Sequence, residues 1–197
     1  MTRQGAVRIG KYRHAISFHM NKLVEAVHYI CSNVGPEDRL GAVKLNKILY
    51  YADMLSYART DRAITGATYV KQFRGPVPTQ VVAAIAQLES DTRLNVTHVS
   101  VFEALRRQFE AIGITDTKVF DAGELDTINE TIRFVCGHTA PEISEISHHV
   151  VWKAADIGEV LPYDSFLVTS LGDIGESDIT IANEAIKAAS RGGNVYA

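Results

Sequence analysis

Residues 44–58, KLNKILYYADMLSYA, are the stretch that says most about how this chain folds. Their apolar positions recur at helical spacing and predict a helix with a broad buried face. The apolar positions are Leu45, Ile48, Leu49, Ala52 and Leu55. Beside them runs a narrow polar stripe at i, i+4, i+7 and i+11, made of Asn46, Tyr50, Asp53 and Tyr57. A polar stripe on a mostly buried helix indicates an internal hydrogen-bond network or the wall of a partner groove.

Asp53 is the costliest member of this stripe to bury. A buried carboxylate is stable only when donors or an opposite charge meet it. We therefore expect Asp53 to contact backbone donors or a basic side chain, and Lys71 and Arg74 are the basic candidates.

The composition is that of a globular protein. The chain has 197 residues, of which 46% are hydrophobic and 22% charged, with a formal net charge of -3. This charge gives no general attraction to nucleic acid or to anionic membranes. We predict that Cys31 and Cys136 are buried free thiols in a reducing compartment. The sequence shows no apolar signal-peptide core and no long apolar run, so we expect a cytoplasmic protein.

The pattern along the chain predicts a mainly α fold, a single compact helical domain with a minor short β element. Helical spacing covers residues 16–34, the 44–58 stretch, 81–88 (with Val81, Val82, Ile85 and Leu88 inward), 102–112, 125–135, 143–154 and about 177–190. Extended pieces are predicted at 68–73 and 94–101, and a turn with a short strand at 113–120. The prolines of Gly75-Pro76-Val77-Pro78 argue against regular structure there.

We divide the chain into three parts on this basis. Residues 1–14 form a flexible basic N-terminal arm that carries Arg3, Arg8, Lys11 and Arg13. Residues 15–170 form the helical domain, and residues 171–197 form a C-terminal helical extension.

A search for chemistry finds no catalytic motif. The sequence has no phosphate-binding glycine loop, HExxH pair, CxxC pair or GxSxG turn. His148 and Trp152 stand four residues apart, which predicts a histidine hydrogen-bonded beside a core tryptophan. Pairing of Asp53 with His148 in a groove is the one enzymatic alternative left open. We expect no catalytic residue, no cofactor and no metal site.

Three segments in this order resemble a known family, the Panacea domain of SocA-like antitoxins. They are KLNKILYYAD in the 44–58 stretch, FRGPVPTQV at 73–81, and LDTINETIRFV at 125–135 followed by EISEISHHVVWKAAD at 142–156. The positions that carry the resemblance are Ile146 and a set that we expect in the core, namely Lys44, Leu45, Lys47, Tyr50, Tyr51, Asp53, Gly75, Pro76, Val77, Ser147, His148 and Trp152. One departure is Arg74, which stands where the family has an aromatic residue, with Phe73 one place earlier.

The resemblance implies a bacterial, prophage-associated antitoxin of a toxin-antitoxin system. Such a protein neutralises a co-encoded protein toxin by direct binding and is not an enzyme. The class of toxin is open, and so is assembly as a homo- or hetero-oligomer. We expect Tyr57, Arg74 and Phe102 to contact the partner, the first two beside a groove between the 44–58 helix and the Gly75-Pro76-Val77 turn. The alternative is a proteolytic adaptor or phage-derived host-interaction protein without a cognate toxin. Nucleic acid ranks low as a partner, because no basic recognition helix stands out.

Overall fold

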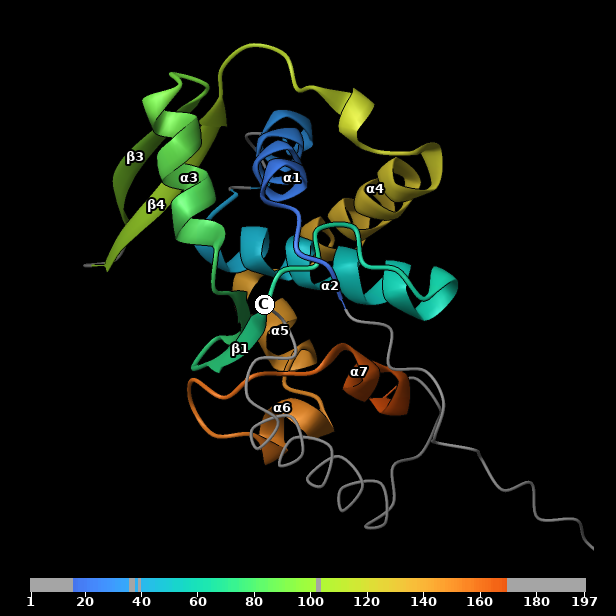
Figure 1. Ribbon diagram of the computed structural model, residues 1–197. Coiled ribbons are helices and arrows are strands. Elements are labelled where there is room, and N and C mark those ends of the chain that lie inside the picture. Colours follow the sequence, from blue (N-terminus) through green and yellow to red (C-terminus); the bar gives the residue numbers. More distant parts are fainter. Residues whose placement is uncertain (1–15, 36–37, 39, 102–103, 170–197) are drawn as a thin grey trace, which may run out of the picture.

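The computed structural model describes residues 16–35, 38, 40–101 and 104–169. Helices dominate this part of the chain, and two separate antiparallel β-hairpins complete it (Figure 1). In chain order the elements are α1 (Met20–Asn33), α2 (Ala42–Thr60), β1 (Tyr69–Gln72), β2 (Gly75–Pro78), α3 (Val81–Ser90), β3 (Leu94–Val101), β4 (Ala104–Ala111), the 3-10 helix η2 (Thr117–Val119), α4 (Ala122–Cys136), α5 (Ala140–Ile146), α6 (Val150–Ala154) and α7 (Tyr163–Thr169). The predicted mainly α fold is confirmed, although the β part is larger than one short element.

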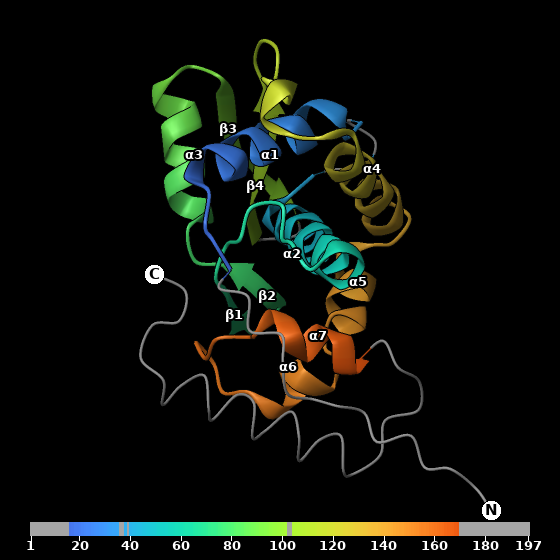
Figure 2. The same ribbon diagram turned by 45° about the vertical axis from the view of Figure 1, so that its right-hand side comes forward.

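Helix α2 lies at the centre of the fold (Figures 1 and 2). It contacts α1, α4, α5, α7 and β2. One side, with Leu45, Ile48 and Leu49, belongs to a hydrophobic cluster shared with α1, α3 and α4. The other side, with Tyr50 and Met54, belongs to a second cluster that includes residues of β1, α6 and α7. A helix packed on both sides buries nearly its whole circumference, as the 44–58 stretch predicts.

Side-chain caps fix where two of the helices begin. Asp121 precedes α4 and accepts a hydrogen bond from the backbone of Glu124, whose carboxylate accepts one from Asp121 in return. Thr139 and Glu142 form the same capping box at the start of α5. These boxes satisfy amide groups that the first turn of a helix leaves without partners. The helix predicted at 125–135 is confirmed as part of α4.

The predicted strand at 68–73 is confirmed as β1, but Gly75–Pro78 is a strand and not irregular structure. The register pairs Tyr69 with Pro78 and Gln72 with Gly75, so residues 73 and 74 form the turn. Proline fits β2 because the outer edge of this strand needs no ladder donor. On its other edge β1 meets the segment before α7, where the amide of Leu161 donates to the carbonyl of Tyr69 at 2.8 Å.

The predicted strand at 94–101 is confirmed as β3, whereas the helix predicted at 102–112 is wrong. Residues 104–111 form β4 and pair with β3 from Leu94↔Ala111 to Val101↔Ala104. The apolar spacing of this segment also suits a strand, because Phe109 and Ala111 alternate onto the face that packs on the core. Apolar spacing alone fits both a helix and a strand here, and pairing with β3 selects the strand.

Three smaller predictions are also wrong. Residues 113–120 contain the 3-10 helix η2 and not a short strand. The helix predicted at 143–154 is interrupted at 147–149, where His149 has extended backbone angles and α6 begins anew. Val82 points outward and is 63% exposed, because α3 buries only Val81, Ala84, Ile85 and Leu88.

Other predictions concern parts outside the described residues. The basic arm at 1–14, the extension at 171–197, the helix at 177–190 and Phe102 all fall there. Within the described part, Cys31 and Cys136 are free thiols, the first buried and the second half-buried. None of the helices in that part is long and apolar enough to cross a membrane.

Candidate functional site

Asp53, in the polar stripe of α2, is at the centre of a buried hydrogen-bond network. The backbone amide of Thr65 donates to Asp53 Oδ1 at 2.7 Å, and the Thr65 hydroxyl donates to Oδ2. The hydroxyls of Tyr69 and Tyr163 reach the same Oδ2 at 2.8 Å and 3.2 Å. Burial raises the pKa of Asp53 above its ordinary value, and these hydrogen bonds lower it part of the way back. The expectation of backbone donors or a basic partner is confirmed through the backbone amide of Thr65, and neither basic candidate contacts Asp53.

Lys71 and Arg74 lie elsewhere. The Lys71 ammonium donates to the carbonyl of Ala155 at 2.8 Å and sits 4.2 Å from the centre of the Trp152 ring. Arg74 is exposed in the β1–β2 turn, where its carbonyl accepts a hydrogen bond from Ser144 at 3.0 Å. Both residues therefore serve the β1–β2 hairpin and not the Asp53 network.

A buried lysine of α2 contacts the Gly75-Pro76-Val77 turn. Lys47 is 1% exposed, and its Nζ donates to the carbonyl of Pro76 at 3.3 Å. Burial lowers the pKa of Lys47 to about 7. Gly75 makes room for this ammonium: with φ at +98°, an added Cβ would lie 2.3 Å from both Lys47 Nζ and Ser147 Oγ. The groove expected between α2 and the Gly75-Pro76-Val77 turn is thus closed by packing at this point.

The third motif segment stacks on the β1–β2 hairpin. The rings of His148 and Trp152 are parallel, with their centres 3.6 Å apart. Trp152 Nε1 donates to the carbonyl of Gln72 at 3.2 Å. Burial lowers the pKa of His148, partly opposed by Glu145. His148 and Trp152 are neighbours as predicted, but their contact is ring stacking. Trp152 is half-buried and not in the core, and among the described residues His148 Nε2 has no hydrogen-bond partner.

Tyr50 connects this segment to α2. Its hydroxyl lies 2.7 Å from His149 Nε2, and its ring makes an edge contact with Tyr69, which binds Asp53. Burial lowers the pKa of His149 to about 4, with Lys47 and His148 adding to the effect, so His149 is neutral and shares a hydrogen bond with the Tyr50 hydroxyl. The three quoted motif segments therefore converge on one side of α2. The sequence reasoning missed His149, whose only signal was its position next to His148.

These contacts limit what the motif residues can do chemically. Asp53 and His148 belong to different networks, and no hydrogen bond joins them. Among the described residues, no three His, Cys, Asp or Glu side chains gather as metal ligands. The arrangement holds together α2, the β1–β2 hairpin and the α5–α6 connection.

The three residues expected to contact a partner differ in their exposure. Tyr57 is buried, and its hydroxyl donates to Asp164, so it offers no surface to a partner. Arg74 is exposed, and Phe102 is outside the described residues. Phe73, beside Arg74 in the turn, is 79% exposed and is not among the expected partner contacts. The sequence signal for this exposure was an aromatic residue shortly before the glycine and prolines of residues 75–78.

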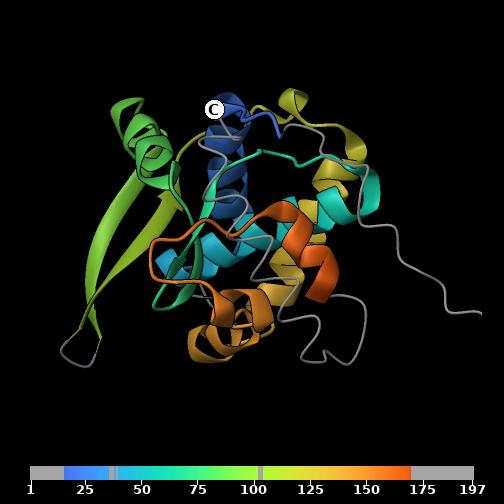
Figure 3. The ribbon, with the colours of Figure 1, turned by 60° about the horizontal axis from the view of Figure 1, so that its bottom comes forward.

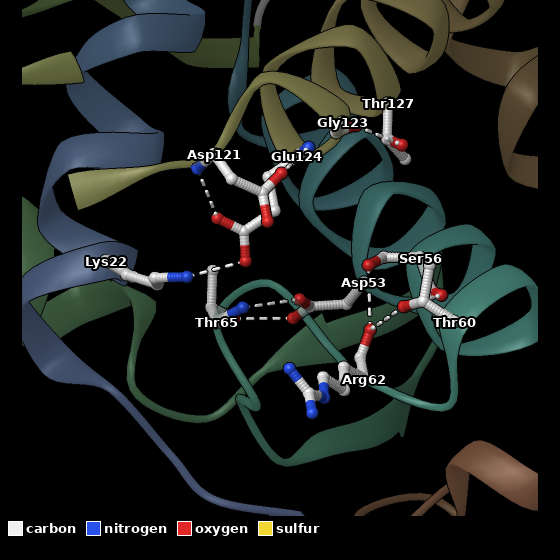
Figure 4. A network of polar contacts seen from close by, with 10 residues as sticks. All are labelled: Lys22, Asp53, Ser56, Thr60, Arg62, Thr65, Asp121, Gly123, Glu124 and Thr127. Atoms are coloured by element: carbon white, nitrogen blue, oxygen red, sulfur yellow. Dashed lines mark hydrogen bonds and ion pairs between the residues drawn. The ribbon is translucent and has the colours of Figure 1, made fainter. Parts of the chain in front are cut away.

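A cavity of about 1080 Å³ opens away from the motif residues, between the C-terminal end of α2 and the N-terminal end of α4. Figure 4 shows Lys22 reaching Glu124 on one side, and Ser56 and Thr60 directed at the Arg62 carbonyl on the other. Its wall carries charges of both signs, from Lys22, Arg59, Arg62, Asp61, Asp121 and Asp126. Such a mixture favours no single class of small ligand. The sequence could not indicate it, since three distant segments form the wall.

The fold and the site define a helical domain whose motif residues join its elements from the inside. The chain belongs to the family described as antitoxin SocA-like, Panacea domain, whose model matches residues 45–153. This match includes the motif positions from Leu45 to Trp152 and confirms the resemblance. No curated protein and no solved structure matches the chain.

Proposed function

We propose that this protein is the antitoxin of a bacterial toxin-antitoxin system and neutralises a co-encoded protein toxin in the cytoplasm by binding it directly. Membership of the SocA-like antitoxin family over residues 45–153 carries the proposal. The toxin class is left open.

The internal contacts of the motif residues support binding over catalysis. Lys47, Asp53 and Tyr50 are each 1% exposed or less, so a substrate could not reach them without opening the core. We infer that the protein has no turnover of its own. A turnover that disappears in His148→Gln, at an unchanged melting temperature, would contradict this inference.

The β1–β2 turn is the surface that best fits a partner contact. Phe73 and Arg74 are exposed at its tip, while the chain around them is held by Ser144 and Trp152. Aromatic and arginine side chains supply much of the binding energy in protein interfaces. A firmly held turn also lowers the entropy cost of binding. We infer that Phe73 and Arg74 anchor the toxin.

Expression of the adjacent gene tests the proposed function. The neighbouring protein alone is expected to stop growth, and co-expression of this chain is expected to restore growth and to yield a complex that co-purifies. In a matched culture, this chain with Phe73→Ser and Arg74→Glu is co-expressed instead, and this variant is expected not to restore growth. A neighbour that is harmless alone and never co-purifies would overturn the proposal.

A further inference from the structure

The outer edge of the β3–β4 hairpin pairs with no described strand, although α3 contacts β3. In its two-stranded sheet β3 pairs only with β4, whereas β4 also meets Gly41 through a bridge at Gln108. In an antiparallel ladder, alternate residues direct their amide and carbonyl groups away from the neighbouring strand. Among the described residues, no backbone hydrogen bond beyond the β4 ladder reaches residues 94–101.

The base of this hairpin is fixed and its far half is free. The Arg93 guanidinium binds both carboxylate oxygens of Glu25 on α1 at 2.7 Å, and Leu94 and Phe109 are buried in the core. Residues 97–100 are all exposed. Figure 3 shows the hairpin reaching away from the helices, with β3 on its outer side. A rigid base with a projecting strand is a preorganised template for strand addition.

The sequence of β3 lacks the features that usually keep an edge strand from pairing with another chain. LNVTHVSV contains no charged residue and no proline, and its pairing with β4 runs through eight consecutive pairs without a bulge. Edge strands that do not join other chains usually carry lysine, proline or a bulge. An open edge of this kind fits a binding surface.

The charges of the far half indicate which partner fits. Arg106 and Arg107 on β4 are exposed, Arg107 lies directly across from His98, and neither arginine has an ion-pair partner among the described residues. In the sequence, residues 96–108 carry these two arginines and one acidic residue, Glu103, so the half keeps a net positive charge. A strand added to β3 would lie about 10 Å from β4, two strand spacings, within the span of an arginine and a carboxylate side chain that face each other. Charge complementarity therefore favours an acidic segment.

We propose that β3 binds an extended acidic segment of the toxin as a third strand of the sheet. This rests on the proposed function, because it names the element through which the toxin is held. The far ends of β3 and β4 and the β1–β2 turn lie on the same side of the molecule in Figures 1 and 3, so one partner could contact both hairpins.

Hydrogen exchange of the complex with the product of the adjacent gene tests this inference. In the free protein, alternate amides of β3 should exchange rapidly, since they face solvent. In the complex these same amides should slow by about tenfold or more, while those paired to β4 change little. A complex that forms with unchanged exchange in β3 overturns this inference and leaves the proposed function standing. If no complex forms, the proposed function fails and the inference with it.

Charge reversal gives an independent readout. Arg107→Glu should weaken the complex by about tenfold, and the loss should shrink at high salt, where charges contribute less. Lys118→Glu makes the same charge change on η2 and should leave the affinity unaltered. Equal effects of the two variants would overturn the acidic segment as the occupant. A dimer of the free protein with protected β3 amides would instead identify a second copy of this chain as the occupant.

Discussion

Asp53 accepts hydrogen bonds from a backbone amide and three hydroxyl groups inside the protein. Its role follows from the cost of leaving those donors unpaired, which is about 1–3 kcal/mol for each buried group. The carboxylate therefore joins α2 to the chain at Thr65, to β1 through Tyr69 and to α7 through Tyr163. Loss of Asp53 should damage the fold before it damages any single function.

Asp53→Ala is expected to lower the free energy of unfolding by about 3 kcal/mol, because it leaves buried donors without an acceptor. Urea unfolding followed by circular dichroism measures the change. Asp126→Ala removes an exposed carboxylate from α4 and should stay within about 0.5 kcal/mol of the parent. Equal stabilities of the two variants would show that the Asp53 network contributes little.

Lys47 should make the stability depend on pH above neutrality. Its pKa is about 7 in the folded protein, lower than in the unfolded chain. Between these two values the unfolded chain binds more protons, so the free energy of unfolding rises with pH. We expect a rise of about 2 kcal/mol between about pH 7 and pH 9, and a loss of this rise in Lys47→Met.

Lys44→Met is the matched control for this pH dependence. Lys44 lies on the same helix, and its ammonium donates to the carbonyl of Asp38 at 3.1 Å. This variant should keep the rise with pH. An identical slope in Lys47→Met and in the parent protein would contradict the assignment to Lys47.

At the scale of elements, the β1–β2 hairpin is the part that the motif residues hold most tightly. Lys47 from α2, Ser144 from α5 and Trp152 from α6 each donate to one of its carbonyls. Gly75 allows this close approach, because it adopts a positive φ and leaves no Cβ between Lys47 and Ser147. The hairpin and the helices should therefore unfold together.

Gly75→Ala should destabilise the protein by about 3 kcal/mol, from backbone strain plus the displacement of Lys47 and Ser147. Gly158→Ala isolates the strain alone, because Gly158 has φ at +85° with nothing within 4 Å of an added Cβ. Its cost should be about 1 kcal/mol. Thermal unfolding of both variants checks the difference, and similar melting temperatures would refute the close packing around Gly75.

The elements also show how far sequence patterns reach. Strong helical periodicity predicted α2 and α4 correctly, because each of them buries a continuous apolar face. The same periodicity misled at residues 102–112, where Leu105, Phe109 and Ile112 match a helix but pairing with β3 decides the conformation. The periodicity also predicted a continuous helix through residues 147–149. The structure instead has a break between α5 and α6 there, which accompanies the stacking of His148 on Trp152.

At the scale of the whole molecule, the proposed function places the partner contact on the side that carries both hairpins. Phe73→Ser with Arg74→Glu should weaken the toxin complex by about tenfold or more and abolish the rescue of growth, with an unchanged melting temperature. Isothermal titration with the purified toxin measures the affinity. Ile114→Ser removes a side chain that is 91% exposed on a different loop and should bind like the parent. Full affinity in the double variant would move the contact elsewhere.

The sequence alone determined the central helix, the order of the motif segments and the family, because helical spacing and the residues within each motif can be read from the chain without knowing its tertiary contacts. It also indicated that Asp53 would need donors, since the cost of burying a carboxylate does not depend on the fold. Only the tertiary structure decided which groups these are, that Lys47 and Tyr57 lie inside, and that Phe73 and the edge of β3 lie outside. The physical reason is that burial and strand pairing depend on segments distant in sequence, and local periodicity carries no record of them.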